Sequence, residues 1–136
     1  MDPYELNLLD GYLNGDNNIA ISIDSGIEDE ILQIKVRFVS RNALNNHKLV
    51  VYLLEDGLIA DQSNYLNFDE TSYFYNQGNP IIDYEHSDVL RHTFTNILGD
   101  QLVNIEPYED VINFYNIDLS TNNFQTENLR IVAFIT

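Results

Sequence analysis

The segment Leu32-Gln33-Ile34-Lys35-Val36-Arg37-Phe38 decides the fold class, because apolar and polar residues alternate along all of it. A β-strand places successive side chains on opposite faces, so this alternation predicts a strand with one buried and one solvated face. We expect the four apolar residues to lie in the core. The cations Lys35 and Arg37 should face solvent and, with Arg41, form a local basic stripe.

Neighbouring segments extend this sheet. Residues 19–24 alternate in the same way, and Asp24-Ser25-Gly26 has the composition of a turn that joins the two strands. The segment 48–54 is apolar on both parities, which is typical of a central strand covered on both faces. Glu55-Asp56-Gly57 follows it and predicts a turn.

Farther along the chain, strands are predicted at 58–60, 89–95, 111–119 and 129–135. A change of apolar parity near Phe114-Tyr115 indicates a bulge, Gly99-Asp100 indicates a turn, and 120–128 has room for one helical turn. Gln62–Pro80 is polar and rich in Asn and aromatic residues, which predicts a long loop. About seven strands with turns between them indicate an all-β, antiparallel two-sheet sandwich of immunoglobulin-like type.

Length and charge narrow the possible partners. The 136 residues predict a single domain, 1–136, in which 1–16 form a loosely ordered N-terminal segment. A net charge of −16 repels phosphate backbones and anionic lipids, so we expect no nucleic-acid partner. No apolar segment approaches the ~18 residues of a membrane span, so we expect no direct membrane insertion. An acidic surface favours solubility, cation binding or a basic partner.

The chain contains no cysteine, which excludes a disulfide scaffold, thiol chemistry and Cys-ligated zinc. This composition is compatible with a reducing cytosol and with an exported bacterial domain that has no disulfide bridges. Met1-Asp2-Pro3 opens no signal peptide. If the protein is exported, we expect this chain to be a mature form or a fragment.

No motif of an activated nucleophile, a phosphate-binding loop or a zinc hydrolase occurs in the chain. The segment closest to a catalytic motif is Tyr84-Glu85-His86-Ser87-Asp88. On a strand, His86 and Asp88 would share a face, a spacing that offers two ligands to a metal. We favour the alternative that both side chains hold the start of the strand by hydrogen bonds, with no metal site and no catalysis.

Calcium is the one cofactor that the composition leaves open. Oxygen-rich segments make Asp10, Asp16 and Asp24 candidate ligands, but none of these segments follows the EF-hand pattern. Asp and Asn are also ordinary turn-forming residues, because they bond their own backbone and tolerate unusual dihedrals. We therefore favour turn formation and expect no cofactor.

The long loop supplies the candidate ligand-binding residues Tyr65, Phe68, Tyr73, Phe74 and Tyr75. A tyrosine offers a large contact area and a polar tip at low entropic cost, which suits a carbohydrate or a protein loop. We favour the structural alternative that these rings fold back to cover an open edge of the sandwich, because aromatic side chains are mostly buried in domains of this size. Their solvent exposure distinguishes the two interpretations.

Two segments carry a family resemblance. Residues 49–62 resemble a strand-turn-strand pattern of the form vvYLvEDgivapQ, and residues 84–91 resemble the pattern Y-x-H-N-H-V-L-R. Both patterns occur, in this order, in the C-terminal β-rich domain of a family named after a twenty-eight-kilodalton outer-membrane protein of Gram-negative bacteria. A looser likeness extends to the last strand, so the resemblance covers roughly 45–136. At Asp88 the family usually has a second His, and this difference speaks against a His–His metal site.

The resemblance implies an exported lipoprotein of the cell envelope, located at the outer membrane or outside the cell. Members often carry a thioredoxin-like domain before the β-rich one, and some are described as adhesins or receptors. This chain would then be the isolated terminal domain. Within the matching motifs, Glu55, Asp56, Gly57, His86, Asp88 and Arg91 form a structural set, in which we expect Arg91 to pair with Glu55 or Asp56.

Three functional hypotheses follow. The leading one is a non-enzymatic surface domain that binds a protein or a glycan, or that spaces the anchored protein from the membrane. The second is a metal-assisted hydrolase or carbohydrate-active enzyme that uses His86, Asp88 and Glu85, which requires a cleft that joins His86 to a second titratable group. The third is a purely structural domain that packs on a neighbouring domain.

Overall fold

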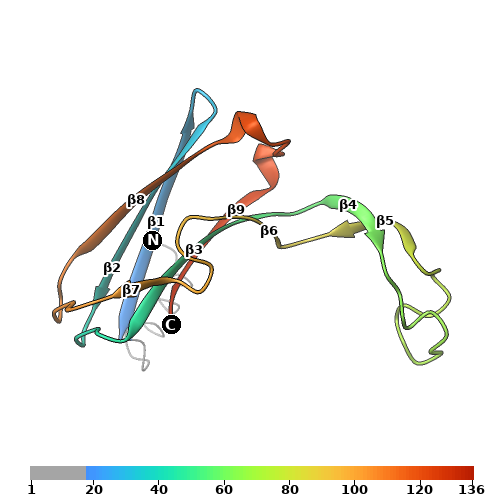
Figure 1. The fold of residues 1–136 in the computed structure, drawn as a ribbon, viewed down its shortest axis with the longest axis horizontal. Coiled ribbons are helices and arrows are strands. Elements are labelled where there is room, and N and C mark those ends of the chain that lie inside the picture. The colour runs from blue at the N-terminus through green and yellow to red at the C-terminus, as the bar shows by residue number, and fades with distance from the viewer. Residues whose placement is uncertain (1–17) are drawn as a thin grey trace, which may run out of the picture.

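Nine strands follow one another along residues 18–136, the part of the chain that this computed structural model describes (Figure 1). Two 3₁₀ turns lie near the C-terminus. The strands are β1 (Ile19–Glu28), β2 (Ile31–Ser40), β3 (His47–Glu55), β4 (Leu58–Gln62), β5 (Ile81–His86), β6 (Val89–Thr93), β7 (Asp100–Leu102), β8 (Val111–Asp118) and β9 (Leu129–Ile135), and the 3₁₀ turns are η1 (Leu119–Thr121) and η2 (Thr126–Asn128).

Seven of these strands form two antiparallel sheets. One sheet has the order β1-β2-β8. In the other, β3 lies at the centre, with β9 along one side and β6 and β7 along the other. Buried side chains of both sheets form one core, so the predicted all-β antiparallel sandwich is confirmed. The finer likeness to immunoglobulin domains stays a prediction.

The alternating segment on β2 behaves as expected. Its apolar side chains are buried, with exposed fractions of 4, 2, 0 and 1% for Leu32, Ile34, Val36 and Phe38. On the opposite face, the Lys35 ammonium lies 3.7 Å from Asp24 on β1, and Arg37 donates two hydrogen bonds to Asp110 at 2.7 and 2.8 Å. The predicted basic stripe is therefore wrong at these two positions, because an acidic neighbour accompanies each cation.

The turn between β1 and β2 lies later than predicted. Ser25 and Gly26 continue β1 and pair with β2, and the chain reverses at Asp29 and Glu30, whose φ angles are 51° and 62°. A two-residue turn with two left-handed residues matches the twist of the strands that it joins. Asp24-Ser25-Gly26 has turn composition, but the register of the hairpin makes it part of the strand.

The bulge predicted near Phe114 is also wrong. Strand β8 pairs with β2 from Val111 to Asp118 without a register shift. The change of apolar parity instead marks a ring on the outer face, because Phe114 is 75% exposed. A register shift occurs elsewhere, between Leu53 and Leu54, where β3 meets β6.

Strands β4 and β5 form a separate two-stranded hairpin, which extends away from the sandwich as an arm (Figure 1). The loop from Ser63 to Pro80 lies at its far end, as the predicted long loop requires. The predicted short strand at 58–60 is present within β4, whereas β5 was not expected. Division of the chain into domains stays a prediction, and the predicted loosely ordered segment 1–16 lies outside the described residues.

Candidate functional site at the tip of the arm

The root of the arm is held by charged side chains. The chain leaves the sandwich after Asp56 and returns at Asp88, whose backbone N–H donates to the Asp56 carboxylate at 2.7 Å. Arg130 of β9 pairs with Asp56 at 3.1 Å and also with Asp88. Gly57 and Asp88 have positive φ angles of 73° and 55°, so both crossing points are tight turns. We call Asp56, Asp88 and Arg130 the root clamp.

Beneath the clamp lies a buried ion pair. Glu55 is fully buried at its side chain and accepts from the Arg91 guanidinium, so Glu55 is the partner that the prediction left open. Its second carboxylate oxygen accepts from the Gln125 N–H at 2.8 Å. The Arg91 guanidinium carbon also lies 4.6 Å from the centre of the Phe124 ring. These contacts tie β3, β6 and the segment before β9 together.

His86 and Asp88 do not share a strand face, so the predicted spacing for a metal pair is wrong. His86 ends β5, where its Nε2 lies 3.3 Å from the Ala60 carbonyl oxygen, and Asp88 occupies the following left-handed turn. Glu85 precedes His86 on β5 and points to the other face. His92 is on β6, with its ring centre 4.9 Å from that of Phe94. Among residues 18–136, no three His, Asp or Glu side chains gather into a metal-binding group.

The structure describes one of the three candidate calcium ligands. Asp10 and Asp16 lie outside the described residues. Asp24 belongs to β1, where it pairs with Lys35 across the strands. The loop in which Asp24 was expected to act is thus a strand, and its role as a calcium ligand stays a prediction.

Side-chain amides, above all the buried Asn64, fix the shape of the arm tip. Asn64 is only 5% exposed, and its side-chain amide donates to the carbonyl oxygens of Phe74 at 2.9 Å and Gly78 at 2.8 Å. Its side-chain oxygen accepts from the Leu66 N–H at 3.1 Å. Asn67 adds a bond from the Gly78 N–H to its side-chain oxygen at 2.8 Å. The loop therefore has a defined conformation that does not depend on a hydrophobic core.

On this scaffold the aromatic rings point into solvent. Tyr65, Phe68 and Tyr73 are 90, 88 and 84% exposed, and Tyr75 is 44% exposed. Phe74 is partly buried and packs edge-on against Tyr73, with ring centres 5.3 Å apart. The rings do not fold back over the sandwich, so the structural alternative for this loop does not hold. Their role in binding stays a prediction.

A cavity of about 390 Å³ lies behind these rings, where the loop joins the hairpin. Asn64, Tyr65, Leu66 and Phe74 of the loop line it together with Tyr84 of β5. Tyr65 thus has a nearly free ring beside a hollow that is lined partly by apolar groups. The tip offers both a protruding aromatic surface and a recess, which is the usual anatomy of a contact site.

A comparison with protein families decides the affiliation of the chain. Residues 5–136 match the family model described as outer membrane protein Omp28. The chain belongs to this family. The match covers more of the chain than the resemblance in its sequence, which began near residue 45. No curated protein and no solved structure matches the chain.

Membership of the Omp28 family implies an envelope protein of the outer membrane. In this Omp28 chain, the two segments that carried the resemblance are the two places where the chain crosses between sandwich and arm: β3 to β4, and β5 to β6. None of the helical turns in residues 18–136 has the length and apolar character needed to cross a membrane.

Sequence reasoning missed several parts of this site. Asn64 and Arg130 were not singled out, although a buried amide and a clamping cation hold the tip and the root. Ile59 and Ile82 on the hairpin are 58 and 63% exposed, and Leu66 at the tip is 46% exposed. The available signal was the absence of any Lys or Arg from residue 49 to residue 90. The acidic residues of this region have no Lys or Arg partner within it.

Proposed function

We propose that this chain is a non-enzymatic binding domain of an exported envelope protein, and that the tip of its arm inserts into a groove on a partner protein. One observation carries the proposal. Three aromatic rings, Tyr65, Phe68 and Tyr73, stand almost fully in solvent on a loop that the buried Asn64 amide braces through two carbonyl oxygens. Exposed apolar groups gathered in one place commonly mark an interaction site.

The order of the loop supports binding in energetic terms. Association costs the conformational freedom of every side chain and loop that becomes ordered at the interface. The bonds from Asn64 to Phe74 and Gly78 hold the backbone of the tip before any partner arrives. Tyr and Phe also lose few rotamers for the area that they bury. The tip therefore loses little conformational freedom on binding, and most of its contact energy contributes to affinity.

Shape and charge favour a protein partner over a glycan. The arm protrudes from the sandwich (Figure 1), and a protruding surface fits a concave partner, whereas a sugar chain is itself held in a groove. The arm, residues 58–86, contains five acids and no Lys or Arg. We infer that the receiving groove has apolar pockets for the rings and a basic rim for acids such as Asp69 and Glu70.

The test compares matched sets of exposed residues. One variant replaces Tyr65, Phe68 and Tyr73 with Ser, and the control replaces Leu98, Tyr108 and Phe114, which are 75, 72 and 75% exposed on the sandwich. A photo-crosslinking residue at position 68 or 114, in cells that carry the protein in their envelope, captures any neighbour of the tip or of the sandwich. We expect a discrete protein adduct from position 68 alone, and a purified partner that binds the tip variant at least about tenfold more weakly.

Three results would contradict the proposal. Equal yields of adduct from positions 68 and 114 would indicate unspecific contacts in a crowded envelope and no recognition by the tip. Binding of a glycan in place of a protein would keep the site but change its ligand class. The absence of any adduct at position 68, with normal localisation, would favour a spacer role for the arm.

A further inference from the structure

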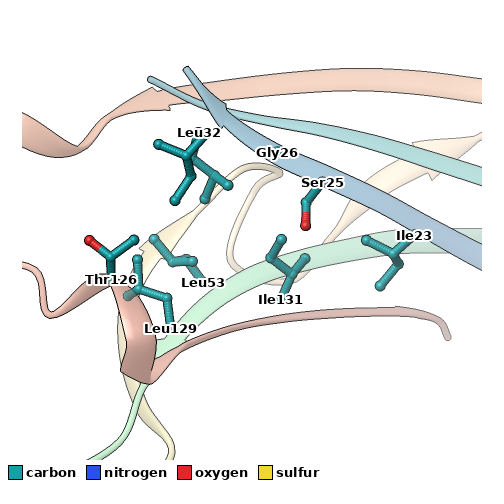
Figure 2. Close-up of a pocket in the computed structure, with 9 residues that line it drawn as sticks. Ile23, Ser25, Gly26, Leu32, Leu53, Thr126, Leu129 and Ile131 are labelled. Carbon is teal, nitrogen blue, oxygen red and sulfur yellow. The ribbon is translucent and has the colours of Figure 1, made fainter. Parts of the chain in front are cut away.

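A separate surface feature lies on the sandwich, at the opening between its two sheets. A hollow of about 480 Å³ separates β1 from β9, and its walls are mostly apolar (Figure 2). Ile23 of β1 and Leu32 of β2 face Leu53 of β3 and Ile131 of β9 across it, with Leu129 at one end (Figure 2). We call this hollow the β1 groove.

The β1 groove exposes side chains that belong to the inner face of the sheet. Ile23 pairs with Val36 and Ile27 pairs with Leu32, and these β2 partners are 0 and 4% exposed. Ile23 and Ile27 point the same way but are 36 and 47% exposed. No residue of 18–136 therefore covers the core along this side of the sandwich.

The backbone along the same side has free hydrogen-bonding groups. A two-residue turn at 29–30 makes Glu28 and Ile31 a hydrogen-bonded pair, and such pairs recur at every second residue. The bond from the Arg41 N–H to the Asn18 carbonyl oxygen, at 2.8 Å, fits this register. The N–H and C=O groups of residues 23, 25 and 27 consequently point away from β2. Within residues 18–136, no backbone group outside the sheet bonds to them.

We propose that the β1 groove binds an extended segment of a partner polypeptide, which adds to the sheet as a strand beside β1. A free strand edge supplies the main-chain bonds and the adjacent apolar hollow receives alternate side chains, which together are the two requirements of strand addition. The residues opposite Ile23 and Ile27 would be apolar and point inward. Those opposite Asp24 and Glu28 would point outward.

The charge of β1 indicates that the outward residues of the added strand are basic. Asp24 and Glu28 lie on the outer face of β1, and Asp29 and Glu30 follow at the turn. Strand β1 has no cation, and Lys35 of β2 is the one cation paired with it in the described residues. Lysine or arginine at alternate positions of the ligand would face these acids across the strands. A second copy of this chain fits poorly, because β1 against β1 would place acid beside acid in two chains of charge −16.

The site is separate from the arm, and its test uses the full chain and a defined probe. The probe is a capped peptide of about eight residues in which Val and Lys alternate, and the control peptide has Glu in place of Lys. Amide hydrogen exchange is followed by NMR. We expect the amides of Ile23, Ser25 and Ile27 to exchange rapidly in the free protein and at least about tenfold more slowly with the Val-Lys peptide.

The amides of Asp24 and Gly26, already bonded to β2, serve as internal controls and should change little. Slow exchange of Ile23, Ser25 and Ile27 in the free chain would overturn the proposal, since it would show that the chain itself or a second copy already covers the edge. Equal effects of the Val-Lys and Val-Glu peptides would overturn the basic specificity.

Two substitutions sharpen the result. Ile27→Lys puts a charge into the groove, and Phe114→Lys puts the same charge on the far strand of the same sheet. We expect only Ile27→Lys to weaken peptide binding, by at least about tenfold. Equal losses in both variants, or no loss in Ile27→Lys, would refute the site. Should Ile27→Lys fail to fold, Ser25→Pro removes one free N–H while it leaves the bonds to β2 intact, and it should weaken binding similarly.

Discussion

The sandwich and the arm are both made of paired antiparallel strands, but different interactions hold them in place. In the sandwich, the inward side chains of β2 are 0 to 4% exposed. In the arm, Ile59 and Ile82 are 58 and 63% exposed, because no second layer from the described part of the chain covers the hairpin. A two-stranded hairpin alone is only marginally stable in water. The arm therefore depends on polar contacts, namely the root clamp and the Asn64 bonds, and its rings are left free for contact.

This difference predicts where a single substitution does the most damage. Arg91→Ala leaves Glu55 buried with one remaining hydrogen bond, from Gln125, and removes the contact with Phe124. Breaking a buried pair from one side destabilises a protein by about 3–5 kcal/mol. We expect the free energy of unfolding of the sandwich, measured by urea denaturation, to fall by an amount in this range.

The matched control is Arg37→Ala, because the Arg37–Asp110 pair has side-chain exposures of 50 and 44%. An exposed pair contributes at most about 1 kcal/mol, so this variant should stay close to the parent protein. A loss below about 1 kcal/mol for Arg91→Ala as well would mean that the Glu55 pair is not a buried, stabilising contact.

In the arm, the largest effect should come from Asn64→Ala and should be local. The substitution removes the donor of the Gly78 carbonyl oxygen and leaves the Phe74 carbonyl oxygen with only the Gln77 N–H at 3.4 Å. A buried group left unsatisfied costs about 1–3 kcal/mol. We expect faster hydrogen exchange and easier proteolysis at the tip, with an unchanged urea midpoint for the sandwich. Ser63→Ala, an exposed neighbour, is the control. A shift of the whole unfolding curve with Asn64→Ala would show that arm and sandwich fold as one unit.

The sequence predicts the two regions unequally, for a physical reason. Apolar patterns report burial, so strands of the sandwich could be recognised: β2 by its alternation and β3 by an apolar run on both parities. Strand β5 has no fully buried residue, and its alternation of Ile82 and Tyr84 with Asp83 and Glu85 is too short to predict a strand by itself. The position of the aromatic loop was predictable, because Gln62–Pro80 lacks any strand pattern.

Other features depend on contacts that residue order does not specify. Asp88 was expected on a strand beside His86, but Asp56 and Arg130 select its left-handed turn. The pairing of Arg91 with Glu55 or Asp56 was predicted from the two matching motifs, but the choice of Glu55 was not. The buried position of Asn64 was not predicted either, since Asn is also an ordinary loop residue.

The root clamp predicts a change of geometry with little change of stability. Its pairs are exposed, at 53% for Arg130, 36% for Asp56 and 64% for Asp88, so Arg130→Gln should cost at most about 1 kcal/mol. The angle between arm and sandwich should nevertheless vary more widely. The chain has no cysteine, so spin labels on Glu70→Cys and Asn116→Cys report one defined distance.

We expect a broader distance distribution in Arg130→Gln, and also in the parent protein at high salt, where exposed pairs are screened. Arg41→Gln, on the sandwich, should leave the distribution unchanged. An equally narrow distance distribution in the parent protein, Arg130→Gln and Arg41→Gln would show that the backbone of the two turns at the root sets the direction of the arm.

The smallest predicted effect concerns two carboxylates, one in each region, that cap turns in the same way. Asp69 at the tip accepts from the Thr71 hydroxyl at 2.6 Å and from its N–H at 3.0 Å, and Asp118 accepts from the Ser120 hydroxyl at 2.5 Å and from its N–H at 2.9 Å. The hydroxyl bond is the larger cause, ahead of the backbone bond, and both lower the pKa of each Asp below its ordinary value.

A lowered folded-state pKa means that each cap stabilises its turn above the unfolded pKa of about 3.9 and is lost as pH falls through the folded pKa. Acid should therefore loosen both turns below about pH 4. The consequence should differ between them, because Leu119 is 9% exposed and anchors the Asp118 turn in the core, whereas the Asp69 turn has no such anchor. NMR titration should show both pKa values rising toward the ordinary value in Thr71→Val and Ser120→Ala, with faster exchange on acidification at the tip alone. Equal loosening of the two turns would mean that the core does not protect the Asp118 turn, and that this contrast between sandwich and arm does not extend to their surface turns.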